Sequence, residues 1–452
     1  VTNPATGEEI VSVPVCGGAE TEKAIVAAQV AQKQWAAKTA KERALVMRRW
    51  FELIMENLDD LAQIMTIEQG KPLAEAKGEI AYAASFIEWF SEEAKRAYGE
   101  VIPSPMPNRK MVVIKQPIGV CAAITPWNFP SAMITRKAAP ALASGCSMVV
   151  KPAEQTPLSA FALAELAERA GVPAGVLSVI TGHSRQIGAV MTSHPIVKKV
   201  TFTGSTSVGK LLMQQSASTL KKLSLELGGN APFIIFDDAD LDAAVEGALL
   251  SKYRNAGQTC VCTNRFLVQQ GVYDVFAKRL SAAVAELKIG DGMEEGVQQG
   301  PLIDEAAVSK VEEMVKDAVS KGACVIGGGA RLSPEGTWYQ PTVLTNTDSS
   351  MMVAKEEIFG PVAPLFKFST EEEAVEMAND TEFGLAAYFY SKDLARAWRV
   401  GEALEYGMVG INTGIISTEV APFGGVKESG LGREGSHYGM DDYMELKYLN
   451  MG

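Results

Sequence analysis

The sequence predicts an α/β protein built around a parallel, doubly wound β-sheet. Short apolar segments of the kind that form buried strands alternate with helical segments over residues 120–215. Strands and helices that alternate in this way form parallel sheets, because each helix carries the chain across the sheet to the next strand. A long helical region precedes this pattern at residues 20–97, and a second α/β pattern follows it at about residues 241–430.

The region 20–97 is expected to be helical because apolar side chains recur at the spacing of one helix face, as at Trp50 and Leu53. Three prolines between residues 103 and 107 then end any helix. Residues 110–116 are rich in strand-forming side chains and predict a β-strand.

The alternating region begins directly afterwards. Its expected strands are residues 120–124, 148–150, 177–180 and 200–202, and its expected helices are residues 131–142, 158–170, 184–191 and 207–215. Parallel sheets of this kind bind ligands at the carboxyl ends of their strands. In the second α/β pattern the strand candidates are Val268, residues 325–326 and residues 388–390, and the tail at 443–449 alternates like a half-exposed strand.

Composition restricts the class of protein. The 452 residues are 47% hydrophobic and 21% charged, as in soluble globular proteins, and no apolar run approaches the roughly 18 residues that span a membrane. The net charge of −12, with no cluster of basic residues, argues against nucleic-acid binding. No basic and apolar leader opens the chain, so we expect a cytoplasmic protein, or one of the mitochondrial matrix if an upstream targeting segment was removed before Val1.

Six scattered cysteines in a chain of this length do not suggest a disulfide framework, and a reducing compartment is expected. Cys260 and Cys262 have no second Cys or His pair nearby, so no metal site is predicted. Cys260 instead follows Gly-Gln-Thr in a turn of small residues, and Glu226 precedes Leu-Gly-Gly-Asn. A thiol and a carboxylate without a neighbouring histidine do not suit a cysteine protease.

Four motifs together resemble the NAD(P)-dependent aldehyde dehydrogenases, in the order that this family shows and over essentially the whole chain. They are residues 126–130 (Pro-Trp-Asn-Phe-Pro), 226–230 (Glu-Leu-Gly-Gly-Asn), 254–262 (Arg-Asn-Ala-Gly-Gln-Thr-Cys-Val-Cys) and 357–361 (Glu-Ile-Phe-Gly-Pro). Within the family, residues 132–137 and 414–417 are most similar to the succinate-semialdehyde dehydrogenases.

The resemblance implies an aldehyde-dehydrogenase-like fold of three parts. A Rossmann-type cofactor domain is expected at residues 1–97 and 118–226, and an α/β catalytic domain at residues 227–430. A small β element at residues 98–117 and 431–452 is expected to join subunits into a homodimer or homotetramer, because an exposed strand edge requires a partner.

The resemblance also implies a covalent mechanism. Cys260 is expected to attack the aldehyde, hydride then leaves to nicotinamide, and water hydrolyses the resulting thioester. Glu226, flanked by leucines, is expected to be the general base for that water, with a pKa raised by burial. Asn128 and the Cys260 backbone N–H are expected to stabilise the oxyanion.

The cofactor residues follow from two segments. Residues 203–210 nearly spell a phosphate-binding P-loop, but Leu211 stands where Mg²⁺ binding requires Ser or Thr. The resemblance instead places Gly204 and Ser205 near a pyrophosphate at a helix N-terminus. It places Lys151 and Glu154 at the adenine ribose, where a carboxylate favours NAD over NADP. The remaining cofactor contacts that it implies are Ile124, Thr125, Trp127, Pro152, Ala153, Leu227, Glu357 and Phe359.

Arg136, Arg254 and Ser417 are expected to bind a substrate carboxylate, since arginine presents a planar fork that matches this group. Succinate semialdehyde is therefore the expected substrate, and glutarate semialdehyde or another aliphatic aldehyde is the alternative, because one methylene gives only weak discrimination. A catalytically silent cofactor-binding relative is a further alternative. Cys262 is a candidate redox switch that would form a disulfide with Cys260.

Overall fold

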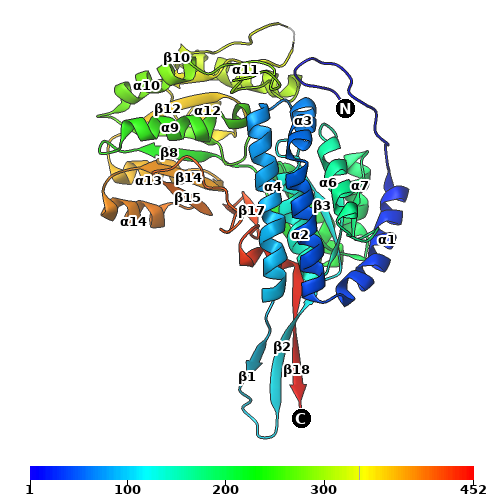
Figure 1. Cartoon of the computed structure of the whole chain (residues 1–452). Helices are drawn as coiled ribbons and strands as arrows, with labels where there is room; N and C mark the ends of the chain where they lie inside the picture. The colour runs from blue at the N-terminus through cyan, green and yellow to red at the C-terminus, as the bar shows by residue number, and fades with distance from the viewer. Residues whose placement is uncertain (335) are drawn as a thin grey trace.

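A computed structural model describes residues 1–334 and 336–452 (Figure 1). The predicted N-terminal helical region is present as four helices, of which the last three pack against one another and the first packs on the parallel sheet. They are α1 (Gly18–Ala37), α2 (Ala40–Glu56), α3 (Leu58–Gln69) and α4 (Leu73–Glu93), followed by the 3₁₀ turn η1 (Ala94–Arg96). Thr39 caps α2 by accepting the backbone N–H of Glu42. Trp35 and Trp50 are fully buried, and their indole N–H groups donate to the carbonyls of Leu142 and Leu163. These hydrogen bonds join α1 and α2 to the helices that cover the parallel sheet.

The predicted parallel sheet is confirmed as a six-stranded sheet with the order β17-β7-β6-β3-β4-β5. All pairs are parallel except the edge pair between β17 and β7. The strands are β3 (Val120–Ile124), β4 (Ser147–Lys151), β5 (Leu177–Val179), β6 (Val197–Thr203), β7 (Lys222–Glu226) and β17 (Gly430–Leu431). The helices are α5 (Ala132–Ser144), α6 (Leu158–Arg169), α7 (Ser184–Ser193) and α8 (Thr206–Ser216), with η2 (Ala217–Thr219).

After β7 the chain enters a second, seven-stranded sheet with the order β10-β11-β12-β9-β8-β14-β15, in which only β10 runs antiparallel to its neighbour. Its strands are β8 (Ala231–Ile235), β9 (Thr263–Gln269), β10 (Cys324–Gly327), β11 (Thr342–Thr345), β12 (Val362–Phe368), β14 (Ala386–Tyr390) and β15 (Met408–Ile411). Its helices are α9 (Leu241–Lys252), α10 (Tyr273–Ala285), α11 (Glu305–Ser320), α12 (Met352–Lys355), α13 (Glu371–Asn379) and α14 (Leu394–Ala403). A small hairpin pairs β13 (Phe383–Gly384) with β16 (Val426–Lys427).

A third sheet projects from the body and contains both chain segments that were expected to form the oligomerisation element (Figure 1). It pairs β1 (Glu100–Ile102) and β18 (Met444–Met451) on either side of β2 (Lys110–Pro117), all antiparallel. The 3₁₀ segment η4 (His437–Tyr443) leads into β18. All side chains of β1 and nearly all of β18 are exposed. The role of this sheet in oligomerisation, and the division into named domains, stay predictions.

In the described part of the chain, none of the helices combines the length and the apolarity that crossing a membrane requires.

Candidate active site

Cys260 lies in a turn between η3 (Arg254–Gly257) and β9, and the backbone before it is constrained. Asn255 and Ala256 both have left-handed conformations, with φ of 51° and 54°. Gly257 has φ of 76°, and a Cβ there would lie 2.2 Å from the Gly360 carbonyl oxygen, so only glycine fits. Because left-handed backbone is unfavourable for Asn and Ala, surrounding contacts must hold this turn in place.

Side chains from the N-terminal helices provide those contacts. Glu75 accepts the backbone N–H of Asn255 at 2.8 Å, and Gln69 donates to the Asn255 side chain at 3.0 Å. Asn255 in turn donates to the carbonyl of Asn128 at 3.0 Å, which links the cysteine turn to the motif at residues 126–130. The sequence alone did not indicate Gln69 or Glu75, because both lie in helices where polar side chains are ordinary.

Asn128 is held from the same direction. Lys71 is buried, forms an ion pair with Glu79 and donates to the Asn128 carbonyl at 2.8 Å. Glu79 also accepts the backbone N–H groups of Ser131 and Ala132 at the start of α5. The Asn128 side-chain amide donates to the Gln258 carbonyl at 3.0 Å, two residues before Cys260. The predicted nucleophile and the predicted oxyanion donor are thus fixed against each other.

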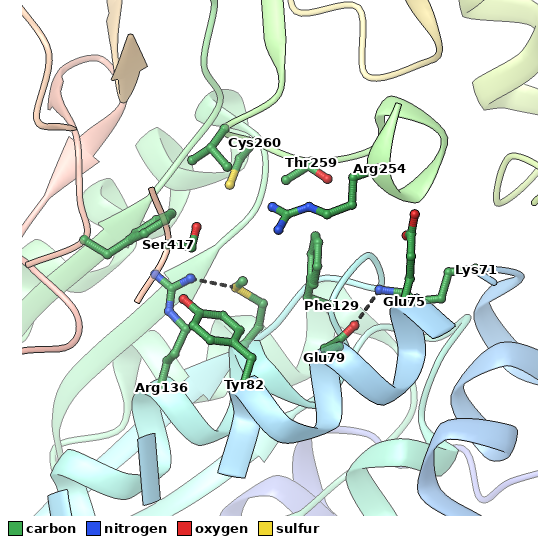
Figure 2. Close-up of a pocket in the computed structure, with 14 residues that line it drawn as sticks. Lys71, Glu75, Glu79, Tyr82, Phe129, Arg136, Arg254, Thr259, Cys260 and Ser417 are labelled. Atoms are coloured by element: carbon green, nitrogen blue, oxygen red, sulfur yellow. Dashed lines mark hydrogen bonds and ion pairs between the residues drawn. The ribbon is translucent and has the colours of Figure 1, made fainter. Parts of the chain in front are cut away.

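Two cavities meet at Cys260. The first, which we call the arginine cavity, has a volume of about 280 Å³ and lies between α4, α5 and the cysteine turn (Figure 2). Its walls include Lys71, Glu75, Gly78, Glu79, Tyr82, Phe129, Arg136, Arg254, Thr259, Ser417 and Phe423. The second, which we call the glutamate cavity, has a volume of about 290 Å³. Its walls include Trp127, Asn128, Gly204, Ser205, Glu226, Leu227, Glu357 and Phe359. The predicted catalytic residues therefore lie together, with predicted substrate residues on one side and predicted cofactor residues on the other.

Arg254 begins η3 and lines the arginine cavity. Its guanidinium lies 5.4 Å from the centre of the Phe129 ring, in a cation–π contact. In the described residues, no carboxylate lies within 4.0 Å of it and no side chain or carbonyl accepts a hydrogen bond from it. Figure 2 shows the guanidinium pointing into the arginine cavity below Cys260.

Arg136 is placed differently. It is fully buried, and one guanidinium nitrogen lies 2.8 Å from Glu434, which also pairs with Lys137. Its guanidinium covers the Phe423 ring at 3.8 Å. Burial alone would raise the pKa of Glu434, but Lys137 and Arg136 hold it below the ordinary value. Arg136 lines the arginine cavity, but the negative charge of Glu434 already offsets its positive charge.

Glu226 ends β7 and is 2% exposed. Within the described part of the chain, neither of its carboxyl oxygens has a hydrogen-bond partner. Burial raises its pKa well above the ordinary value, and the negative charge of Glu434 raises it further. This matches the expectation of a buried carboxyl group with a raised pKa.

The Cys260 thiol is also affected by burial, which raises its pKa to about 12 although Arg136 acts in the opposite direction. The resting thiol is therefore protonated at neutral pH. Cys262 is buried, and its thiol contacts the Lys252 carbonyl at 3.7 Å. The side chain of the candidate redox partner is thus engaged with the end of α9.

The remaining predicted cofactor residues occupy two places. Ser205 precedes α8, and the backbone N–H of Gly204 donates to the Glu226 carbonyl at 3.0 Å. Glu357 accepts the Gly229 N–H at 3.1 Å, and burial raises its pKa to about 7. Phe359 packs edge-on against Trp127, with ring centres 5.6 Å apart. These residues line the glutamate cavity, and their contact with a cofactor stays a prediction.

The second group lies at the carboxyl ends of β3 and β4, outside the glutamate cavity. Ile124 is opposite Lys151 in the sheet, and the Thr125 N–H donates to the Lys151 carbonyl. The Lys151 ammonium donates to the Ser184 hydroxyl at 2.7 Å, and that hydroxyl donates to Glu154 at 2.6 Å. Pro152 and Ala153, both buried, connect the two charged residues.

The P-loop alternative fails in the structure as well as in the sequence. Lys210, which would have to reach a phosphate, is 59% exposed and forms an ion pair with Glu428 at 2.7 Å. The described residues also contain no group of three or more His, Cys, Asp or Glu side chains placed to hold a metal ion.

Comparison with known proteins now identifies the class. The model of the aldehyde dehydrogenase family matches residues 1–449. The chain belongs to the aldehyde dehydrogenase family, and the resemblance found in the four motifs is confirmed.

Individual relatives are similar over the whole chain. A glutarate-semialdehyde dehydrogenase of Pseudomonas aeruginosa is 67% identical over 452 residues, which cover 100% of this chain and 94% of that protein. The NADP(+) succinate-semialdehyde dehydrogenase GabD of Escherichia coli is 65% identical with the same coverage. The crystal structure of a succinate-semialdehyde dehydrogenase from Burkholderia pseudomallei superposes with a TM-score of 0.99 at 67% identity, covering 100% of this chain and 94% of that one. The predicted fold class is confirmed.

Proposed function

We propose that this aldehyde dehydrogenase oxidises succinate semialdehyde to succinate with NAD(P)⁺. The observation that carries the proposal is the Arg254 guanidinium, which faces the cavity beside Cys260 and has no ion-pair partner among the described residues. A half-buried cation gains stability when it is paired, and a substrate carboxylate would supply the partner. Relatives that are 65% and 61% identical are named succinate-semialdehyde dehydrogenases.

The proposed chemistry assigns one role to each residue around the thiol. Cys260 loses its thiol proton to solvent and attacks the aldehyde carbon as the thiolate, and the resulting oxyanion accepts hydrogen bonds from the Asn128 amide and the Cys260 backbone N–H. Glu226 takes a proton from the water that hydrolyses the thioester, and a raised pKa suits a base that must bind and release protons near neutral pH. When bound, NAD(P)⁺ accepts the hydride that leaves the substrate carbon.

The glutamate cavity fits such a cofactor. Ser205 stands at the N-terminus of α8, where backbone N–H groups favour phosphate. A Cβ at Gly204 would lie 2.4 Å from the Phe202 ring, so only glycine fits directly before Ser205. Glu357 and Phe359 would contact the nicotinamide ribose and ring, and Lys151 and Glu154 the adenine ribose.

We propose NAD as the preferred cofactor, with NADP also possible. The Glu154 carboxylate would accept hydrogen bonds from both ribose hydroxyls and repel a 2′-phosphate. The E. coli relative is named for NADP(+), so the preference is a property to measure on this chain. Initial rates with each cofactor test it, and a preference for NADP would contradict it.

Glutarate semialdehyde, one methylene longer, is the second candidate substrate. Two relatives, 67% and 66% identical, are named glutarate-semialdehyde dehydrogenases. A methylene contributes only about 1–3 kcal/mol of discrimination, so the two acids can share one site. A catalytically silent protein is a third possibility, which an absence of turnover with every aldehyde would support.

The test measures NADH formation with succinate semialdehyde, glutarate semialdehyde and the uncharged aldehyde butanal. The wild type is compared with Arg254→Ala and with Arg48→Ala, a surface arginine that pairs with Glu88. We expect the wild type to prefer the acids, and only Arg254→Ala to lose this preference, by roughly 10²-fold in kcat/KM for an ion pair of about 2–5 kcal/mol. If butanal is used equally well by the wild type, the substrate and the arginine's role are both wrong.

We further propose a homodimer or homotetramer joined through the three-stranded sheet. Its strands β1 and β18 are edge strands with exposed side chains, and such edges are normally covered by a partner. Light scattering after gel filtration measures the state, and a monomer would contradict the proposal. The six free cysteines support a reducing compartment such as the cytoplasm, and the mitochondrial matrix remains the alternative location.

A further inference from the structure

One face of helix α4 forms a wall of the arginine cavity. Glu75, Gly78, Glu79 and Tyr82 follow at intervals of three or four residues, so they lie on the same side of the helix. Glu75 and Glu79 are engaged with backbone N–H groups of the cysteine turn and of α5. The hydroxyl of Tyr82, on the same face, makes no such hydrogen bond among the described residues.

The Tyr82 hydroxyl is buried and unsatisfied. Its oxygen is shielded from bulk water, and among residues 1–334 and 336–452 it has no hydrogen-bond partner. The ring is fixed edge-on against Phe86, with centres 4.9 Å apart and planes at 73°. Phenylalanine would fill the same space without an unsatisfied hydroxyl, which is costly in a buried position. A ligand that supplies a hydrogen-bond acceptor would satisfy this hydroxyl.

The surroundings define the chemistry of that acceptor. Burial raises the pKa of Tyr82, while the nearby positive charges of Arg136 and Arg254 act to lower it. In Figure 2 the Tyr82 hydroxyl lies beside the Arg136 guanidinium, with Ser417 beyond that guanidinium and Arg254 farther across the cavity. An acceptor placed among two guanidinium groups and two hydroxyls is favoured when it is anionic.

We propose that the Tyr82 hydroxyl donates a hydrogen bond to the carboxylate of the bound aldehyde, so that α4 helps to select acids over neutral aldehydes. The inference rests on the proposed function, because it assumes a semialdehyde acid as substrate. It adds a hydrogen-bond donor on α4 to the proposed substrate-binding residues Arg136, Arg254 and Ser417. No motif in the sequence points to Tyr82, because a tyrosine on an amphipathic helix is ordinary.

The experiment compares Tyr82→Phe with wild type and with Tyr98→Phe, which removes a hydroxyl from an exposed ring. KM and kcat are measured for succinate semialdehyde and for butanal at saturating NAD⁺. In Tyr82→Phe we expect KM for the acid to rise roughly ten- to hundredfold, as for a lost hydrogen bond to a charged group, while kcat and both butanal constants stay unchanged. The melting temperature should be equal or higher, because an unsatisfied hydroxyl has been removed.

The outcomes separate this inference from the function it rests on. If the wild type prefers the acid and Tyr82→Phe keeps the same KM, the hydroxyl does not bind substrate, and the proposed function stands. If Tyr82→Phe loses activity equally with both aldehydes and its melting temperature falls, Tyr82 acts through packing, which overturns the inference. If the wild type shows no preference for the acid, the proposed function fails and the inference fails with it.

Discussion

The two cavities that meet at Cys260 have similar volumes and opposite chemistry. The arginine cavity presents Arg136 and Arg254 with the hydroxyls of Tyr82 and Ser417, whereas the glutamate cavity presents the carboxyl groups of Glu226 and Glu357. The guanidinium groups therefore attract an acidic aldehyde to the arginine side of the thiol, and the glutamate side offers it no guanidinium. The difference teaches that the charged groups lining the two cavities favour one side for the approach of an acidic substrate to the nucleophile.

The two sides also differ in how their charges are neutralised within the protein. In the arginine cavity, Arg136 is paired with Glu434, whereas Arg254 forms no ion pair with any of the described residues. In the glutamate cavity, burial raises the pKa of Glu226 well above its ordinary value. The first side thus holds a permanent positive charge, and the second holds a carboxyl group whose charge depends on pH.

The largest expected effect follows from replacing Glu226 by Gln. The thioester would still form, but the water that hydrolyses it would lack a base, so steady-state turnover should fall about 10²–10⁴-fold. Stopped-flow absorbance should show a burst of about one NADH per active site followed by slow turnover. Cys260→Ala, which removes the nucleophile, should show neither burst nor turnover. A Glu226→Gln enzyme with normal steady-state turnover would remove Glu226 from the mechanism.

The pH dependence of the wild type sharpens the same assignment. The raised pKa of Glu226 means that its basic form becomes populated as pH increases, so turnover should rise with pH through that pKa. The Glu226→Gln variant should lose this rise, because glutamine does not titrate. Identical pH profiles for the two enzymes would contradict the prediction.

The next prediction compares the stability contributions of the ion pair between Arg136 and Glu434 and of the Arg254 side chain. Glu434→Gln would leave the buried cations of Arg136 and Lys137 without their carboxylate, which should destabilise the fold by about 3–5 kcal/mol. Arg254→Met in the same cavity removes a cation that forms no ion pair with the described carboxylates, so the stability change should be well below about 1 kcal/mol. Thermal melting of the two variants measures the difference. Equal losses of stability would mean that the two arginines are not distinguished by their pairing.

Much of this organisation was predictable from the sequence, and the part that was not has a physical reason. Strands such as β3 and β4 are buried on both faces and appear as continuous apolar runs, so they were recognised. Strands β11 and β12 were missed because one is only four residues long and the other contains Pro364 and Lys367, which interrupt the pattern.

The same distinction applies to the site. Cys260, Glu226 and Asn128 stand in local motifs, and the structure brings them together as expected. Lys71, between α3 and α4, and Glu79, in α4, have no local motif, because charged side chains normally face water. Only the packing of α4 on α5 buries them near Asn128. The pairing of Arg136 with Glu434 depends on a contact between distant segments, which periodicity cannot reveal.

A smaller effect is expected at the adenine end of the glutamate side. Glu154→Ser removes the carboxylate that Ser184 now binds at 2.6 Å and frees the ammonium of Lys151 for a phosphate. KM for NADP should fall roughly tenfold, because the carboxylate is largely exposed and solvent screens it. The control Glu165→Ser removes an exposed carboxylate from α6 that pairs with Arg169. Unchanged use of NADP by Glu154→Ser would show that this carboxylate does not select the cofactor.

The smallest expected effect concerns Cys262, which we propose as a redox partner of Cys260. Mild peroxide would oxidise the Cys260 thiol to a sulfenic acid, and the Cys262 thiol would then displace water from that sulfur to form a disulfide. The effect should be partial, because the Cys262 thiol must first leave the Lys252 carbonyl and the loop between the two cysteines is a single residue.

After peroxide treatment, dithiothreitol should restore more activity to the wild type than to Cys262→Ala, by about twofold. Without its partner thiol, the Cys260 sulfenic acid proceeds to the sulfinic state, which dithiothreitol does not reverse. Cys324→Ala removes an exposed thiol elsewhere and should behave like the wild type. If Cys262→Ala is equally sensitive to peroxide and equally restored, Cys262 protects nothing, and the contact with Lys252 holds it permanently away from the nucleophile.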